Sequence, residues 1–151
     1  AKLLFKAGFK TLRLSFESAY THLQQASSSK VTNDELVHAR DYLVQAGYQP
    51  KTIGVYVMVG FPGQTAQEAF DSLAFVHKLG FKINLVHYSP IPGTVAFEEA
   101  VRTIPALRTE PLYHNKSFFS LMAPAFGLST VQEIKQHVQS LNASLSLQEH
   151  A

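Results

Sequence analysis

Three segments of the chain have the hydrophobic patterns of β-strands. Residues 10–16 alternate apolar and polar side chains, and residues 53–59 form a nearly unbroken apolar, β-branched run. Such a run is typical of a strand that is buried on both faces of a parallel sheet. Residues 83–88 form a third, shorter apolar segment. The sequence therefore predicts three strands.

Helices are predicted between these strands from their capping residues. Thr32–Glu35 and Thr65–Glu68 have the spacing of capping boxes, and apolar side chains recur at helical spacing after each. The two predicted helices end at Gly47 and Gly80, because glycine readily adopts the left-handed conformation found after helix ends. The alternation of strands and helices predicts right-handed βαβ units with a parallel sheet.

The remaining segments have weaker signals. Residues 2–8 resemble the end of a helix with no cap before it, which suggests a piece of a longer protein. Residues 19–31 are ambiguous, and Val95 to Val101 can form a short helix. An irregular stretch with Phe118 and Phe119 follows. The last helix begins at Ser129 or Thr130 and has an apolar face of Val131, Ile134, Val138, Leu141 and Leu145.

This order of elements predicts an α/β fold, as half of a TIM-like barrel or as a small open sheet. We expect residues 1–97 to form the parallel βα region and residues 98–151 an irregular and helical extension. At 151 residues the chain has the length of one domain and can bury a substantial core.

Composition excludes several classes of protein. Apolar residues make up 46% of the chain and charged residues 16%, the net charge is +2, and no apolar stretch reaches the roughly 18 residues of a membrane helix. The basic residues near the start are Lys2, Lys6, Lys10 and Arg13, which we interpret as a solvated face. We therefore expect a cytoplasmic protein that binds neither membrane nor nucleic acid. There is no cysteine, so this chain alone cannot ligate zinc or iron through thiolates.

Candidate site residues follow each predicted strand. They are Ser15-Phe16-Glu17-Ser18, Gly60-Phe61-Pro62-Gly63 and Tyr88-Ser89-Pro90. The carboxyl ends of parallel strands meet at one edge of a sheet, where α/β folds bind ligands. We expect these residues to line one cleft, with open backbone N–H groups in the Gly-rich turn.

Single residues allow more than one interpretation. Glu17 could orient a ligand or cap a turn, and His87 could line the site or simply pack. No dinucleotide-binding, P-loop, nucleophile-elbow or His-Glu-x-x-His motif occurs.

Taken together, three motifs resemble the radical S-adenosylmethionine (radical SAM) superfamily. They are Leu-Ser-Phe-Glu-Ser from Leu14, Val-Gly-Phe-Pro-Gly-Gln-Thr-x-x-Glu from Val59, and Tyr-Ser-Pro-Ile-Pro-Gly-Thr from Tyr88. The resemblance covers residues 8 to 97. This part of the chain is similar to the last three strands of the six-stranded partial barrel of the superfamily. Members with a cobalamin-binding domain are the most similar, and methylthiotransferases are related to them.

The resemblance assigns residues to S-adenosylmethionine (SAM). Ser15 and Glu17 would contact its ribose or methionine end. Val59, Gly60, Phe61 and Pro62 would pack against the adenine, and Tyr88, Ser89 and Pro90 would close over the adenosine. Gln64 stands where many relatives have Glu. The family's three cysteines, which hold a [4Fe–4S] cluster, have no counterpart among these residues.

The resemblance implies a fragment of an iron–sulfur oxidoreductase that cleaves SAM to a 5′-deoxyadenosyl radical. This part would bind SAM without catalysing a reaction, and cobalamin is a possible further cofactor. Two alternatives stay open. One is half of another α/β-barrel enzyme with an anion at the Gly-Phe-Pro-Gly turn, and the other is a non-catalytic scaffold. A half-barrel would expose apolar interior side chains such as Leu12 and Leu14, so we expect self-association.

Overall fold

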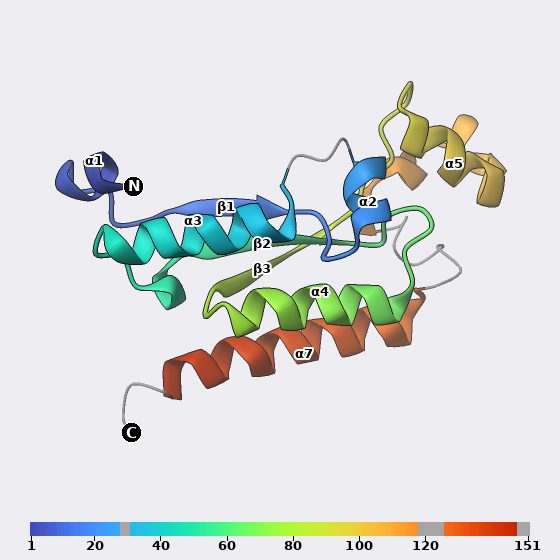
Figure 1. Cartoon of the computed structure of the whole chain (residues 1–151). Helices are drawn as coiled ribbons and strands as arrows, with labels where there is room; N and C mark the ends of the chain where they lie inside the picture. Colours follow the sequence, from blue (N-terminus) through green and yellow to red (C-terminus); the bar gives the residue numbers. More distant parts are fainter. Residues whose placement is uncertain (28–30, 118–125, 148–151) are drawn as a thin grey trace.

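Three parallel strands form the centre of the structure, a computed structural model that describes residues 1–27, 31–117 and 126–147. Figure 1 shows helices arranged along the sheet and a separate group of short helices beyond the carboxyl ends of the strands. In chain order the elements are α1 Lys2–Lys6, β1 Arg13–Phe16, α2 Thr21–Ala26, α3 Asn33–Gln45, η1 Pro50–Thr52, β2 Gly54–Val59, α4 Ala66–Lys78, β3 Lys82–His87, α5 Val95–Thr103, η2 Pro105–Arg108, η3 Pro111–His114 and α7 Leu128–Leu147.

The sheet has the predicted strand order and direction. β1 pairs with β2, and β2 pairs with β3, in parallel. Leu14 lies opposite Val55, which in turn lies opposite Ile83. The α/β class and the adjacent parallel strands are therefore confirmed, and a half-barrel stays a prediction.

The two faces of the sheet have different surroundings. Val55, Val57 and Val59 are fully buried in a core shared with α3, α4 and α7. Leu12 and Leu14 pack against this core, so the prediction that they are barrel-interior side chains without neighbours is wrong. The reason is the two-residue period of a strand, which places both leucines on the same face as Phe16 and the buried valines. The opposite face carries both polar and apolar side chains, among them Ser15, Tyr56 and Met58.

Both predicted capping boxes are confirmed. The Oγ1 atoms of Thr32 and Thr65 accept the N–H groups of Glu35 and Glu68 at 3.3 and 3.2 Å. The glutamate carboxylates accept the threonine N–H groups at 2.8 Å in return. These bonds satisfy donors that would otherwise lack partners at the start of α3 and α4.

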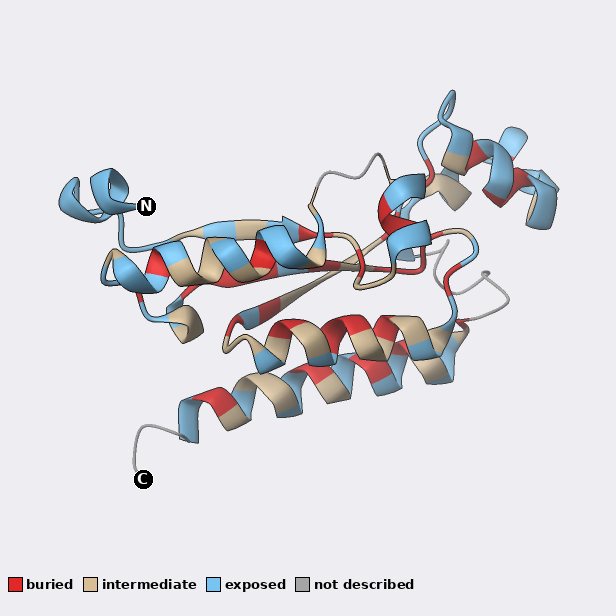
Figure 2. Ribbon diagram, in the orientation of Figure 1, coloured by how far each residue is buried: buried red, intermediate tan, exposed pale blue. Residues whose placement is uncertain are grey.

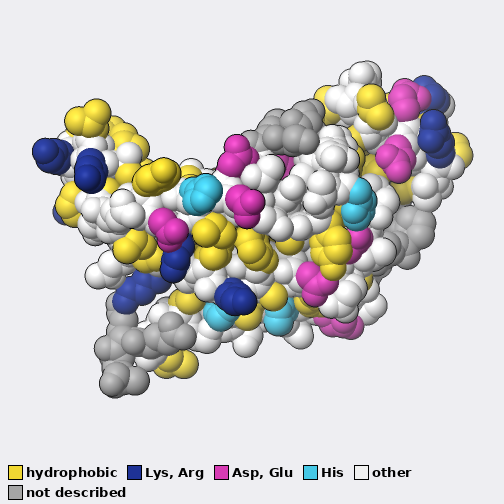
Figure 3. Space-filling view, viewed as in Figure 1, with side chains coloured by type: hydrophobic (Ala, Val, Ile, Leu, Met, Phe, Trp, Pro, Cys, Tyr) yellow, Lys and Arg dark blue, Asp and Glu magenta, His cyan; other side chains and the backbone are white. Residues whose placement is uncertain are grey.

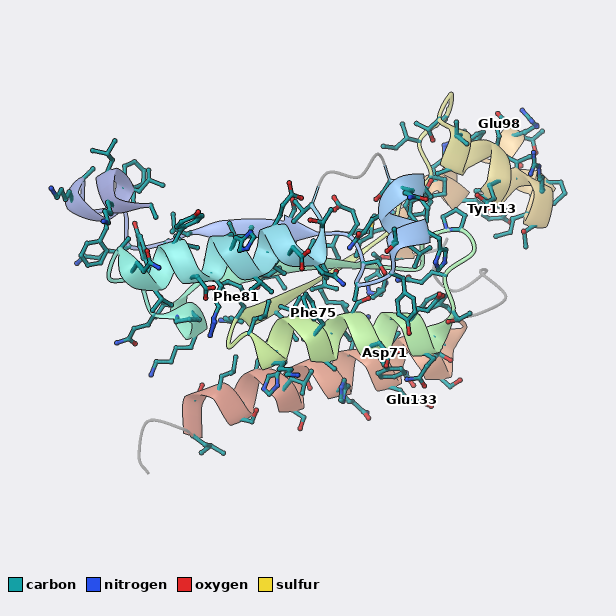
Figure 4. All side chains as sticks on the ribbon, viewed as in Figure 1. Asp71, Phe75, Phe81, Glu98, Tyr113 and Glu133 are labelled. Atoms are coloured by element: carbon teal, nitrogen blue, oxygen red, sulfur yellow. The ribbon has the colours of Figure 1, made fainter. Side chains whose placement is uncertain are left out.

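α7 covers the sheet together with α4. Its residues Val131, Ile134 and Val138 belong to the same buried core as the strands, and Figure 2 shows buried stripes on α4 and α7. Phe16 and Phe75 stack in this core with ring centroids 5.5 Å apart, and Figure 4 labels Phe75 on α4. The predicted segment 98–151 therefore contributes to the main core. Phe118 and Phe119 lie outside the described residues.

Asn142 of α7 also contacts the outer edge of β3. Its Oδ1 accepts the N–H of Ile83 at 2.8 Å, and its Nδ2 donates to the Ile83 carbonyl at 2.9 Å. The side-chain amide thus takes the place of a neighbouring strand at that residue.

In the described ranges, no helix combines the length and the apolar character that crossing a bilayer requires. On the face in Figure 3, Lys and Arg side chains lie in separate groups among acidic and apolar ones.

Candidate functional site

The candidate site lies at the carboxyl edge of the sheet, where the segments after the three strands meet. A cavity of about 690 Å³ opens there, within the roughly 300–1,000 Å³ of small-molecule sites. Four of the nine predicted site residues line it, namely Glu17, Phe61, Tyr88 and Ser89. The parallel strand order brings them together from segments more than 70 residues apart in sequence, counted from Glu17 to Ser89.

Ser15 lies beside this cavity. With Glu17, Tyr56 and Met58 it borders a second hollow of about 350 Å³ on the open face of the sheet. Glu17 and Met58 line both hollows, so the two are contiguous.

Of the other four predicted residues, Val59, Gly60 and Pro62 form the end of β2 and the turn after it, and Pro90 follows β3. Val59 is fully buried, and its carbonyl accepts the N–H of Tyr88 at 2.9 Å. Gly60 adopts a φ of 81°, which side chains other than glycine's rarely allow. Val59, Gly60, Pro62 and Pro90 do not line the cavity.

The side chain of Gln64 accepts hydrogen bonds from the backbone of the Gly-rich turn. Its Oε1 accepts the N–H groups of Gly60 at 2.8 Å and of Phe61 at 3.3 Å. The expectation of open N–H groups in this turn is therefore wrong for these two residues. Gln64 is 2% exposed, and its Nε2 has no hydrogen-bond partner among the described residues.

An aromatic pair forms one wall of the cavity. Phe61 and Tyr88 lie edge to face, with ring centroids 5.0 Å apart and planes at 68°. Both side chains are 7% exposed and belong to a second apolar cluster with Leu23 and Phe97. Burial raises the pKa of the Tyr88 hydroxyl, so this residue is neutral at physiological pH.

Glu17 has an unsatisfied carboxylate oxygen. Its Oε2 is buried and has no hydrogen-bond partner in the part of the chain that the structure describes. A buried carboxylate oxygen without a donor is costly, typically by about 1–3 kcal/mol or more. Because Glu17 borders both hollows, a ligand with hydroxyl or ammonium groups could supply the missing donor.

Besides His87, the other lining residues come mostly from α2, α5 and the residues that cap these two helices. They are Gln25, Ala26, Ser27, Met58, Val86, Ile91, Thr94, Val95 and Ala96. Residues 19–31 gave no clear helical pattern, so nothing in the sequence indicated that α2 reaches this edge. The prediction of a short helix after Thr94 is confirmed, and the Oγ1 of Thr94 caps it by accepting the Phe97 N–H at 3.1 Å.

His87 also lines the cavity, one of the two possibilities that the sequence left open. Burial lowers the pKa of its imidazole, and the positive charges of Lys135 and Lys116 lower it further. The side chain is therefore mostly neutral at pH 7. Ser89 is held in place because its hydroxyl donates to the His114 carbonyl.

The site offers no ready-made metal centre. In residues 1–27, 31–117 and 126–147, no group of three or more His, Cys, Asp or Glu side chains could hold a metal ion.

Comparison with known proteins gives a partial similarity. No protein-family model matches the chain. The chain is 30% identical over 86 residues to the tRNA-2-methylthio-N(6)-dimethylallyladenosine synthase of Bdellovibrio bacteriovorus. The match covers 56% of this chain and 19% of the relative, so the chain spans about a fifth of that protein's length. This similarity is compatible with a radical SAM fragment of the methylthiotransferase kind, and it gives no support for cobalamin.

Proposed function

We propose that this chain forms one wall of the SAM site of a radical SAM enzyme. The observation that carries the proposal is the buried Oε2 of Glu17, which has no hydrogen-bond partner among the described residues and borders the same cavity as the Phe61–Tyr88 pair. The partial similarity to a methylthio-transferring synthase supports the same superfamily.

The chemistry of these residues matches the parts of SAM. Its ribose hydroxyls and the ammonium group of its methionine end are donors, and the Oε2 of Glu17 has no donor among the described residues. Its adenine is a flat aromatic ring that can pack against Phe61 and Tyr88. A charged or polar donor to Glu17 would fix the orientation of the ligand, and the aromatic wall would exclude water from it.

Cluster ligands must come from polypeptide outside these 151 residues, because the chain has no cysteine. When both are bound, the cluster and SAM would supply one-electron radical chemistry. The role of this chain is to bind and orient SAM at the sheet edge and to shield the reaction from solvent.

The alternative of an anion at the Gly-Phe-Pro-Gly turn has less support. The N–H groups of Gly60 and Phe61 already donate to Gln64. At the start of α4, the N–H groups of Thr65 and Glu68 are taken by the capping box. An anion that used these four N–H groups would have to displace the bonds that they already make.

Isothermal titration calorimetry of the chain with SAM tests the proposal. We expect saturable binding that Glu17→Ala weakens by about tenfold or more, since a hydrogen bond to a charged group contributes about 1.5–3 kcal/mol. Glu133→Ala is the matched control, because Glu133 is exposed on α7, away from the cavity, as Figure 4 shows. Equal affinities for wild type and Glu17→Ala, or no saturation with SAM, would contradict the assignment.

A further inference from the structure

The buried polar side chains lie behind the candidate site. Apart from tyrosines, the described part of the chain buries four polar side chains, and one of them, Gln64, bonds the turn after β2. The other three are Ser18, Gln24 and Ser72, which are at most 5% exposed. They bond one another or the backbone of the segment that follows Glu17. Polar groups are costly to bury unless they are hydrogen-bonded, so these bonds are made where the strands end and hold the segments there in one conformation.

Ser72 of α4 bonds the segment after β1 through its hydroxyl. This hydroxyl donates its single proton to the Glu68 carbonyl at 2.7 Å, one turn earlier in the helix. Its oxygen therefore accepts two other bonds, from the Ala19 N–H at 3.0 Å and from the Ser18 hydroxyl at 3.2 Å. The hydrogen-bonding capacity of Ser72 is thus fully used.

Helices α2 and α3 bond the same segment. The Nε2 of Gln24 donates to the Ser18 carbonyl at 2.7 Å and to the Oδ1 of Asn33 at 2.9 Å. The Nδ2 of Asn33 donates to the Ala19 carbonyl at 3.0 Å. Together with α4, three helices therefore fix the backbone directly after Glu17.

The backbone is also fixed before Glu17. Phe16 is the last residue of β1 and pairs with Val57 of β2, so Glu17 follows on beside Met58. The buried Oε2 of Glu17 has no hydrogen-bond partner among the described residues. In a loose segment this carboxylate would turn toward water, because a buried oxygen without a donor is costly.

We propose that Ser72 and Asn33 are positioning residues of the SAM site, whose bonds to the segment after β1 hold the Glu17 carboxylate at the cavity. This role rests on the proposed function for the identity of the ligand. Ser72 is not among the residues that line the cavity, so it acts through Glu17. Alanine would suit its buried helical position better, because alanine is the best helix former and buries no polar group. The bonds to the segment after β1 offset that difference.

A double-mutant cycle of SAM affinities, measured by isothermal titration calorimetry, tests this role. Ser72→Ala and Asn33→Ala should each weaken SAM binding by about fivefold, within the range of couplings between neighbouring residues. In the Glu17→Ala background each should change the affinity by less than about twofold, because the carboxylate that they position is absent. A general loss of structure would give equal losses in both backgrounds.

Ser144→Ala is the matched control. The Ser144 hydroxyl also donates to its own helix, at the Leu141 carbonyl at 2.8 Å, and it bonds the Nε2 of His77 of α4 at 2.9 Å. It lies two residues from Asn142, which bonds Ile83 near the start of β3, at the end of the sheet opposite to the cavity. Its removal should leave the SAM affinity unchanged.

NMR of the ligand-free chain tests the position of Glu17 independently of SAM. In the wild type, cross-peaks should connect the side chains of Glu17 and Met58, which line the same two hollows. The Ala19 amide should exchange slowly, because it donates to Ser72. Ser72→Ala should speed this exchange and remove the cross-peaks, and Ser144→Ala should change neither. Circular dichroism establishes that each variant is folded.

Two results would overturn the proposal. They are Glu17–Met58 cross-peaks that persist in folded Ser72→Ala and Asn33→Ala variants, and losses of SAM affinity that are as large in the Glu17→Ala background as in the wild type. A wild-type chain that does not bind SAM saturably would instead contradict the proposed function, and the cross-peaks of the ligand-free chain would still decide whether Ser72 and Asn33 position Glu17.

Discussion

The Oε1 of Gln64 accepts the N–H of Gly60 at 2.8 Å, and this bond stabilises the Gly-rich turn after β2. A second N–H, from Phe61, reaches the same oxygen at 3.3 Å. The turn that positions Phe61 in the cavity wall is thus held by a buried side chain four residues further along the chain.

Gln64→Ala should destabilise the protein by about 1–3 kcal/mol, because two buried N–H groups would lose their acceptor. Urea unfolding measures the free energy. Gln64→Glu retains an acceptor and removes the Nε2 that has no partner in the described residues, so its loss should be smaller than that of Gln64→Ala. Gln132→Ala on the exposed face of α7 is the control and should change stability by less than about 0.5 kcal/mol. Equal losses for Gln64→Ala and Gln132→Ala would disprove the role of this bond.

Asn142→Ala should also destabilise the fold, by roughly 1–3 kcal/mol, since it leaves both backbone groups of Ile83 unpaired. Asn142→Asp keeps an acceptor for the Ile83 N–H but loses the donor to its carbonyl. Hydrogen exchange at the Ile83 amide should therefore be fastest in the alanine variant. Ser140→Ala, at an exposed position of the same helix, should leave this exchange unchanged.

Stability should fall as the pH drops below about 6.5, the ordinary pKa of histidine. Burial and two nearby lysines lower the pKa of His87 in the folded state, so the unfolded chain binds its proton first. The loss begins near the unfolded-state pKa and is complete below the folded-state pKa. His87→Gln should remove this part of the pH dependence, and His38→Gln, at an exposed position, should not. A His87 ring that titrates above 6.5 by NMR would refute the prediction.

The chain alone should assemble no iron–sulfur cluster. Anaerobic incubation with iron and sulfide, followed by desalting, should leave no visible cluster absorption, because there are no thiolate ligands. A stable brown protein would show that other side chains can hold a cluster and would contradict our assignment of the ligands to other polypeptide.

The sequence predicted the strand order and the helix starts because those depend on local signals. The run Val55–Val59 and the two capping boxes specify their structures within a few residues. The sequence did not predict that Leu12 and Leu14 lie on the face of the sheet that the helices cover. The alternation of apolar and polar residues shows that both leucines share a face, but it does not show which face the helices cover.

The sequence also predicted that some of the candidate residues would meet at one edge of the sheet. Glu17, Phe61, Tyr88 and Ser89 follow strands, and parallel pairing places all strand ends at one edge. The return of Gln64 onto Gly60 and the approach of α2 to the cavity depend on tertiary packing that no local pattern encodes.

NMR mapping of SAM binding is the most direct test of the central claim. The account predicts that a SAM titration shifts the backbone amide signals of Glu17, Phe61 and Tyr88 along one saturable curve. Signals of Glu133 and its neighbours on α7 should stay in place. Saturable shifts elsewhere, or no shifts at Glu17 and Phe61 with millimolar SAM, would contradict it.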